Sequence, residues 1–149
     1  MKHLKILRRF LSTHEIKSII RENRCGFDRN LKKVIFTEVG CGRCAGELLI
    51  CEEHISKRNT LHGGMALTLV NAFTTYGLLT HCDCLNVPSL PMEMYLAYLK
   101  PCKRGDEVEI VAETIKVGKK LAFTKCAVRH KERGDLVVFG YHTKYLMRQ

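Results

Sequence analysis

Little in this sequence departs from the pattern of an ordinary globular domain. Of its 149 residues only three are proline. It has no low-complexity run and no internal repeat. Hydrophobic residues make up 46% and charged residues 27% of the chain, which is normal for a folded domain. A chain of this length can bury a core of its own, so one domain is expected.

A secretory signal with an apolar core and a cleavage site is also lacking, so the eight cysteines are expected to be reduced. Cys41 and Cys44 have the spacing of a zinc knuckle, and the segment 81–84 adds histidine, cysteine and aspartate. A second paired motif at the usual distance is missing. This favours a Gly-rich hairpin turn for Cys41 and Cys44 and core positions for the others, with no metal.

Residues 61–80 contain no Asp, Glu, Lys or Arg, which suggests a membrane span. Glycine, threonine and asparagine side chains make this segment too polar for a good one. A helix buried on all sides inside the domain fits better.

The formal charge of +10 favours a polyanionic partner, which is a nucleic acid, an anionic membrane or a phosphate-rich small molecule. The glycine–aromatic strand motifs of common RNA-binding modules are absent, so no nucleic acid is expected. Residues 1–10 carry four basic side chains and no acid. This resembles a short mitochondrial presequence and equally an amphipathic first helix. We expect a cytoplasmic or mitochondrial protein, or both, with at most weak membrane association.

Hydrophobic periodicity predicts a helix over 4–22, strands over 31–39 and 46–53, and a buried helix over 62–80. A strand follows to about residue 99, with Pro88 and Pro91 at its entry. Val108, Ile110 and Ala112 then alternate with glutamates, as in a half-exposed strand. Turns at 116–120 and 131–135 bound strands over 121–130 and 136–146. The order predicts an α+β fold: a largely antiparallel sheet with one apolar helix.

The segment His62-Gly63-Gly64, at the start of the uncharged helix, is the strongest sign of chemistry. Glycine lacks the Cβ that would block close approach of a ligand to the backbone. The first N–H groups of a helix have no internal partner and lie at the positive end of its dipole. Such a site can stabilise a carbonyl oxygen that becomes negative during attack on a thioester.

These elements resemble the hotdog fold, and specifically the small acyl-coenzyme A thioesterases of the thioesterase superfamily member 2 (acyl-CoA thioesterase 13) type. The resemblance covers about residues 12–147 and rests on five segments: 52–54, 60–64, 68–70, 118–124 (Gly-Lys-Lys-Leu-Ala-Phe-Thr) and 142–144 (His-Thr-Lys). It implies an antiparallel sheet wrapped around one long central helix, over 12–149, with a short N-terminal helix and an extension over 1–11. It also implies a homodimer or homotetramer with active sites between subunits.

The resemblance implies hydrolysis of fatty acyl-CoA with no cofactor apart from the coenzyme A of the substrate. Gly63 would donate its N–H to the thioester carbonyl, and His62 would hold that loop. The helix carboxylate of the family falls on Asn71, and a loop asparagine falls on Ser56. A serine of the next strand falls on Pro91, with Ser89 two residues earlier on the same strand face. Coenzyme A would contact Tyr98, Lys116, Val117, Gly118, Lys119, Lys120, Leu121 and Tyr145.

Asn71 lacks the basicity to take a proton from water near neutral pH. Because general-base catalysis contributes about 10²–10⁴-fold, this departure favours a second hypothesis: a weakened hotdog protein that binds acyl-CoA or a partner protein without efficient turnover. A base elsewhere is the other explanation, from His62, His54 or Glu93. Simpler structural roles are also open: His62 as a helix cap, Glu93 and the hairpin lysines as surface charges, Tyr98 and Tyr145 as packed aromatics.

Overall fold

The computed structural model describes residues 14, 18 and 26–148. The predicted extension over 1–11 and nearly all of the predicted helix over 4–22 lie outside these residues. In chain order the elements are η1 (Gly26–Leu31), β1 (Ile35–Gly40), β2 (Arg43–Leu49), η2 (Glu52–His54), α2 (Gly63–Leu79), η3 (Cys82–Cys84), β3 (Ser89–Tyr98), β4 (Glu107–Val117), β5 (Leu121–His130) and β6 (Leu136–Leu146).

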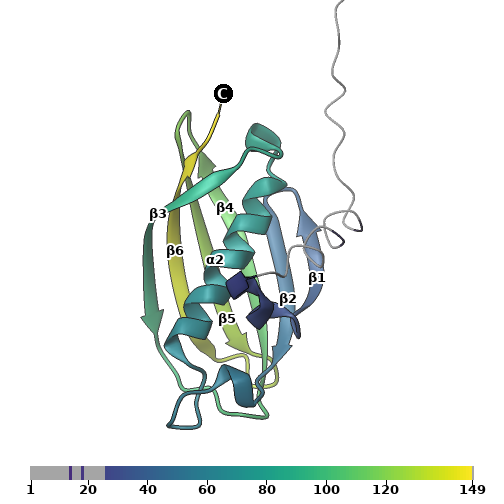
Figure 1. The fold of residues 1–149 in the computed structure, drawn as a ribbon, viewed down its shortest axis with the longest axis vertical. Coiled ribbons are helices and arrows are strands. Elements are labelled where there is room, and N and C mark those ends of the chain that lie inside the picture. Colours follow the sequence, from purple (N-terminus) through teal and green to yellow (C-terminus); the bar gives the residue numbers. More distant parts are fainter. Residues whose placement is uncertain (1–13, 15–17, 19–25, 149) are drawn as a thin grey trace, which may run out of the picture.

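The strands form one six-stranded sheet in the order β1-β2-β4-β5-β6-β3, and every neighbouring pair is antiparallel. Helix α2 lies along one face of this sheet, and the strands curve around it (Figure 1). The predicted α+β architecture with a wrapped central helix is therefore confirmed.

The periodicity of each element explains its place. Strands β4 and β5 bury alternate residues, such as Val108, Ile110 and Ala112, against the helix. Helix α2 has no charged residue and buries ten of its seventeen residues. A helix that is apolar around most of its circumference needs a sheet that curves around it, and this wrapping supplies the core. Among the described residues, no helix is long and apolar enough to cross a membrane.

Three predicted bounds are wrong near the first hairpin. The segment 31–39 begins as the end of η1, and the strand starts only at Ile35. The second strand ends at Leu49, because the chain turns into η2 over part of the predicted strand 46–53. The tight turn is shorter than 41–44: Cys41 and Gly42, both with positive φ, make the turn, and Arg43 already belongs to β2.

Strand β3 is an edge strand, and this explains how it accepts a proline within its length. Pro91 is its third residue, and its pairing with β6 shifts register between Pro91 and Glu93. Proline cannot donate to the ladder, so edge strands and bulges are where it is tolerated. The outer edge of β3 has no strand partner among the described residues, and Leu90, Met92 and Tyr95 are exposed on it.

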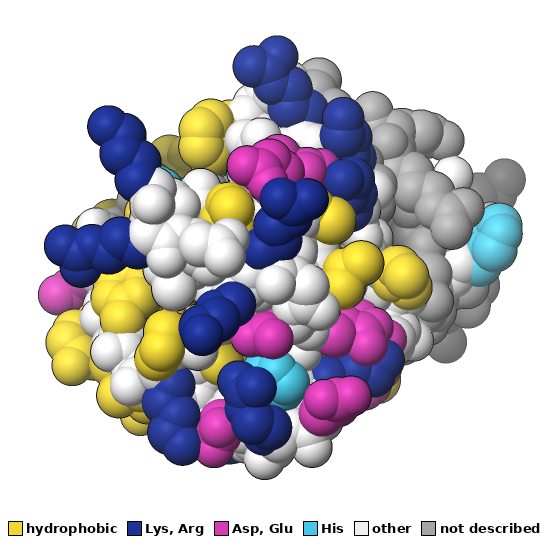
Figure 2. All heavy atoms as spheres, turned by 90° about the horizontal axis from the view of Figure 1, so that it is seen from below, with side chains coloured by type: hydrophobic (Ala, Val, Ile, Leu, Met, Phe, Trp, Pro, Cys, Tyr) yellow, Lys and Arg dark blue, Asp and Glu magenta, His cyan; other side chains and the backbone are white. Residues whose placement is uncertain are grey.

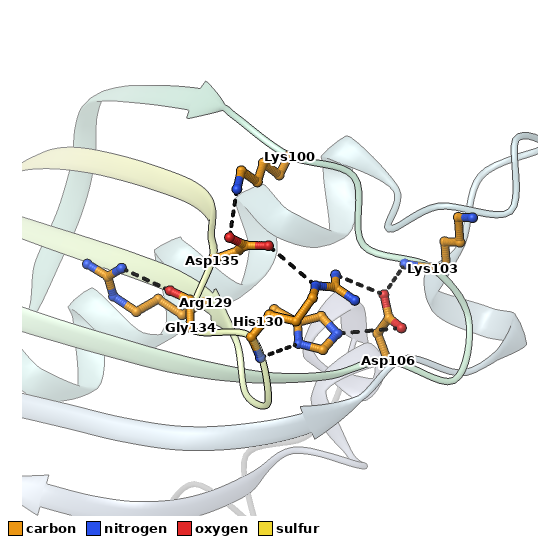
Figure 3. Close-up of polar contacts among 8 residues, drawn as sticks. Lys100, Lys103, Asp106, Arg129, His130, Gly134 and Asp135 are labelled. Atoms are coloured by element: carbon orange, nitrogen blue, oxygen red, sulfur yellow. Dashed lines mark hydrogen bonds and ion pairs between the residues drawn. The ribbon is translucent and has the colours of Figure 1, made fainter.

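The end of the molecule where α2 begins is closed by a polar network (Figure 3). Asp106 accepts a hydrogen bond from the Lys103 N–H at 2.8 Å and lies 3.5 Å from the His130 Nε2 atom. The Arg133 N–H donates to Nδ1 of the same histidine. A bridge between Lys103 and Thr60 ties the network to the loop before α2. On this face acidic and basic side chains are interspersed, without a uniformly basic surface (Figure 2).

We expect Asp106→Ala to lower the free energy of unfolding by about 1–3 kcal/mol at pH 7, because it removes the charged acceptor of this network. The hydrogen bond from the Lys103 N–H, with His130 nearby, holds the pKa of Asp106 below its usual range. The stabilisation is therefore complete above the ordinary aspartate pKa and is lost as the pH falls through the lowered pKa of the folded state. Urea unfolding at pH 7 and near pH 3 measures both effects.

Glu132→Gln is the matched control for this experiment, since Glu132 is an exposed carboxylate in the neighbouring turn. Its unfolding midpoint should equal that of the wild type. Equal midpoints for Asp106→Ala and the wild type at pH 7 would contradict a structural role of the network.

Candidate active site

The loop before α2 is held by main-chain hydrogen bonds. The Leu61 N–H donates to the Cys102 carbonyl at 2.7 Å, and the His62 N–H donates to the His54 carbonyl at 2.9 Å. Both acceptors belong to segments outside the helix, so the first turn of α2 starts from a fixed position.

His62 caps α2, and the cap leaves the Gly63 N–H free. The Nδ1 atom of His62 accepts a hydrogen bond from the Gly64 N–H at 2.9 Å. Within the described part of the chain, the Gly63 N–H has no hydrogen-bond partner. This donor lies at the positive end of the helix dipole. Gly63 can therefore donate to a carbonyl oxygen, while His62 is engaged as a cap through Nδ1.

Tyr98 lies beside this glycine, at the end of β3. Its hydroxyl donates to the Gly63 carbonyl at 3.1 Å. A Cβ added to Gly63 would meet the Tyr98 hydroxyl at 3.5 Å, an ordinary contact distance. Tyr98 thus holds the Gly63 carbonyl by a hydrogen bond and leaves room for a methyl group on the Gly63 Cα atom.

Ser56 lies in a tight turn of the same loop. Its hydroxyl oxygen accepts a hydrogen bond from the Arg58 N–H at 3.3 Å and lies 3.4 Å from the Thr60 hydroxyl. The Ser56 N–H also bonds the Thr60 carbonyl at 2.8 Å. The hydroxyl therefore stabilises the turn that leads to His62.

Asn71 lies two turns further along α2, in a separate cavity of about 220 Å³. We call this the Asn71 cavity; it is lined by Asp28, Asn71, Ala72, Thr75, Tyr76, Ser89, Pro91 and Lys144. The Oδ1 atom of Asn71 and the hydroxyl of Ser89 are both buried without a hydrogen-bond partner. Two unpaired polar atoms in one cavity leave hydrogen-bonding capacity for water or a ligand.

Lys144 contributes an ionisable group to this cavity. Its side chain is 1% exposed, and its Nζ atom bonds the Thr75 hydroxyl at 2.7 Å. Burial lowers the pKa of Lys144 to about 8. Among the described residues it forms no ion pair, so its charge has no compensating carboxylate in contact.

His142, two residues earlier on β6, is the second buried base in this region. Its Nδ1 atom is 2.8 Å from the Thr74 hydroxyl, which itself donates to the Val70 carbonyl. Burial, with a contribution from the charge of Lys144, lowers the pKa of His142 to about 3. The imidazole is therefore neutral at physiological pH and has a structural hydrogen bond.

The two halves of the candidate site are far apart within one chain. Asn71 is eight positions after Gly63 on α2, which is about 12 Å along a helix axis. Gly63 and Asn71 of the same chain are therefore too far apart to contact the reacting atoms of one thioester together. A site that uses both residues requires a second copy of the chain.

The predicted coenzyme A contacts are divided in the same way. Lys116, Lys119 and Lys120 are exposed around the β4–β5 turn, and Tyr145 pairs with Leu121 next to it. This turn lies at the end of the molecule where α2 finishes, and Tyr98 lies at the end where α2 begins (Figure 1). The structure therefore does not bring Tyr98 to the hairpin within one chain.

The other candidate bases are occupied or exposed. The Nδ1 atom of His54 accepts a hydrogen bond from the Cys51 N–H at 3.0 Å, and burial lowers the pKa of this histidine. Glu93 is exposed on β3. Neither residue lines the Asn71 cavity.

The two cysteines that have zinc-knuckle spacing lie in different surroundings. Cys41 is exposed in the turn, whereas Cys44 is buried in β2, and burial raises the pKa of the Cys44 thiol and disfavours a thiolate ligand. The ligand atoms of His81, Cys82 and Asp83 lie within 4.8 Å of one another. However, the His81 Nδ1 atom accepts a hydrogen bond from the Asp83 N–H, which caps η3.

Sequence reasoning missed Asp28, Thr75 and Lys144 as lining residues of the Asn71 cavity. For Lys144, the sequence itself contains a pattern that indicates burial. Gly140, His142, Lys144 and Leu146 share one face of β6 by the two-residue period, and this is the buried face. A lysine in register with core residues predicts an inward-pointing amine.

Comparison with known proteins agrees with this geometry. The family model described as Thioesterase superfamily matches residues 58–137. Mouse (Mus musculus) acyl-coenzyme A thioesterase 13 is 37% identical over 121 residues, which cover 81% of this chain and 85% of the relative. The crystal structure of zebra fish thioesterase superfamily member 2 has a TM-score of 0.87 and 33% identity, covering 91% of this chain and 99% of its own. The Mus musculus structure of the same name has a TM-score of 0.83 and 33% identity, covering 91% and 98%.

Proposed function

This chain belongs to the thioesterase superfamily, and we propose that it is an acyl-coenzyme A thioesterase that hydrolyses fatty acyl-CoA to a free fatty acid and coenzyme A. One observation carries the chemistry: the unpaired N–H of Gly63 at the start of α2, held in place by the His62 cap. When water attacks the thioester carbon, the carbonyl oxygen becomes negative and accepts from this N–H. The C–S bond then breaks as the carbonyl double bond re-forms, and the departing sulfur takes up the proton that the water has lost, so coenzyme A leaves as a thiol.

The basic hairpin supports coenzyme A as the leaving group. Lys116, Lys119 and Lys120 are all exposed, and no acidic side chain is found between residues 114 and 131. Coenzyme A carries several phosphate charges at its nucleotide end, which lysines bind as point charges. No cofactor other than the substrate itself is required for this reaction.

We propose that the working form is a homodimer or a homotetramer. The separation of Gly63 from Asn71 supports this proposal, since a site that used both residues would need two chains. The free edge of β3 supports this proposal, since an edge strand with exposed apolar side chains can pair with a second copy. An antiparallel pairing of two such edges would bring the start of one α2 toward the middle of the other.

The second candidate function is that of a protein that binds acyl-CoA or a partner protein without efficient turnover. Asn71 is the specific observation in its favour, because an amide at the position of the family carboxylate cannot accept a proton from water.

A steady-state assay on acyl-CoAs of increasing chain length tests the proposal, with release of free thiol as the readout. Turnover of at least one chain length supports the enzyme. Tight binding of acyl-CoA by calorimetry with no thiol release supports the second candidate function and rejects the proposed activity.

A further inference from the structure

The Asn71 cavity contains the parts of a water-binding site. The Asn71 Oδ1 atom is an acceptor without a partner, and the Ser89 hydroxyl is a donor and acceptor without a partner. Lys144 lines the same cavity. A buried water needs two to four polar partners, and these three groups supply them.

The hydrogen bonds of Thr75 define what Lys144 still offers. The Thr75 hydroxyl donates its only proton to the Asn71 carbonyl at 2.6 Å. Toward Lys144 it can therefore act only as an acceptor, and Nζ must donate to it across 2.7 Å. A neutral amine has two N–H groups and one lone pair. One N–H is used by Thr75, so the lone pair remains free to accept a proton in the cavity.

We propose that Lys144 is the general base of the reaction, a catalytic residue that accepts a proton from a water held by Asn71 and Ser89. This inference rests on the proposed thioesterase function and deepens it. As the water oxygen bonds to the thioester carbon, its O–H bond breaks and the proton forms an ammonium at Nζ. When the C–S bond breaks, the ammonium returns its proton to the departing thiolate sulfur, which restores the neutral amine.

Burial makes this role compatible with neutral pH. Desolvation brings the pKa of Lys144 to about 8, so about one molecule in ten has a neutral amine at pH 7. A base with a pKa close to the working pH is the most efficient kind. In this proposal, Lys144 on β6 acts as the base in place of the carboxylate that the family has at position 71. Asn71 orients the water.

Near Lys144, the titratable groups of the Asn71 cavity and its surroundings are the phenol of Tyr76, the imidazole of His142 and the carboxyl group of Asp28. His142 has a structural hydrogen bond to Thr74 and a pKa lowered to about 3, which makes it a weak base. Asp28, on η1, lines the cavity and is half-exposed. Its carboxylate is the competing assignment, so the experiment includes it.

The test compares kcat/KM for acyl-CoA hydrolysis from pH 6 to pH 10 in the wild type and in Lys144→Met, Lys144→Arg, Asp28→Asn and Lys125→Met. We expect the wild-type value to rise about tenfold per pH unit up to about pH 8 and then to level. Lys144→Met should lose at least about 100-fold and the inflection near pH 8. Lys144→Arg should lose as much, because arginine keeps the charge but does not deprotonate. Lys125→Met, at a half-buried lysine of β5 that pairs with Glu113 outside the Asn71 cavity, should match the wild type in kcat/KM.

Melting temperatures of all variants separate loss of catalysis from loss of folding, and Asn71→Asp gives a second measurement. A carboxylate at position 71 would be a base that works at low pH, so this variant should exceed the wild type by about 100-fold at pH 6 and by much less at pH 9.

Each alternative outcome has a distinct meaning. An active wild type whose rate is unchanged in Lys144→Met, or abolished in Asp28→Asn, overturns the assignment of Lys144 and leaves the thioesterase function standing. An inert wild type with an active Asn71→Asp variant also overturns it, since the cavity then works only with a carboxylate. If neither protein hydrolyses any acyl-CoA, the proposed function itself fails, and the base with it.

Discussion

Replacement of Gly63 by proline should reduce kcat for acyl-CoA hydrolysis by about 10²–10³-fold, which is the usual effect of removing one oxyanion donor. The substitution deletes the unpaired N–H of Gly63 at the start of α2. It should not unfold the helix, because Gly63 is the first helical residue, where proline is favoured. The preceding His62 has φ −64° and ψ 132°, the conformation that a following proline requires.

Gly63→Ala is the matched control. Alanine keeps the N–H, and its Cβ would meet the Tyr98 hydroxyl at an ordinary 3.5 Å. We expect it to retain most of the turnover, while its methyl group raises KM if the acyl chain passes close to the helix start. Steady-state kinetics of both variants decide the point. Equal kcat for Gly63→Pro and the wild type would exclude Gly63 as the oxyanion donor.

The fold was predictable because its strongest periodicities are local. The alternation over 108–112 and the uncharged stretch 61–80 each indicate one element, and the structure contains both. The errors fall where tertiary context decides. Ile50 and Cys51 continue the apolar run at the end of β2, but the chain leaves the sheet at Leu49 and forms η2. Similarly, Pro91 is accepted inside β3 only because β3 is an edge strand, which the local sequence does not specify.

The site was predictable in part, for the same reason. The His62 cap and the free Gly63 N–H follow from a motif of three consecutive residues. The Asn71 cavity instead joins η1, α2, β3 and β6, which are distant in sequence. A resemblance to known thioesterases indicates position 71, but it does not show that Lys144 is buried next to it. That contact depends on the packing of β6 against α2.

Two inactive variants should regain activity when they are combined. Gly63→Pro removes the oxyanion donor, and Asn71→Leu removes the amide that we expect to hold the water. If each site takes Gly63 from one chain and Asn71 from another, a mixed dimer contains one intact site and one doubly damaged site. Unfolding and refolding an equimolar mixture should therefore give about a quarter of the wild-type kcat, since half of the dimers are mixed and each has one working site of two.

Asn71→Leu is suited to this test because the Asn71 Oδ1 atom has no hydrogen-bond partner to lose. Leucine of similar size should leave the melting temperature nearly unchanged. The control is the same refolding of each variant alone, which should stay inactive. If the mixture is as inactive as its components while light scattering shows a dimer, Gly63 and Asn71 do not share a site across the interface. A monomer with full wild-type turnover would exclude the shared site directly, because about 12 Å of helix separates the two residues within one chain.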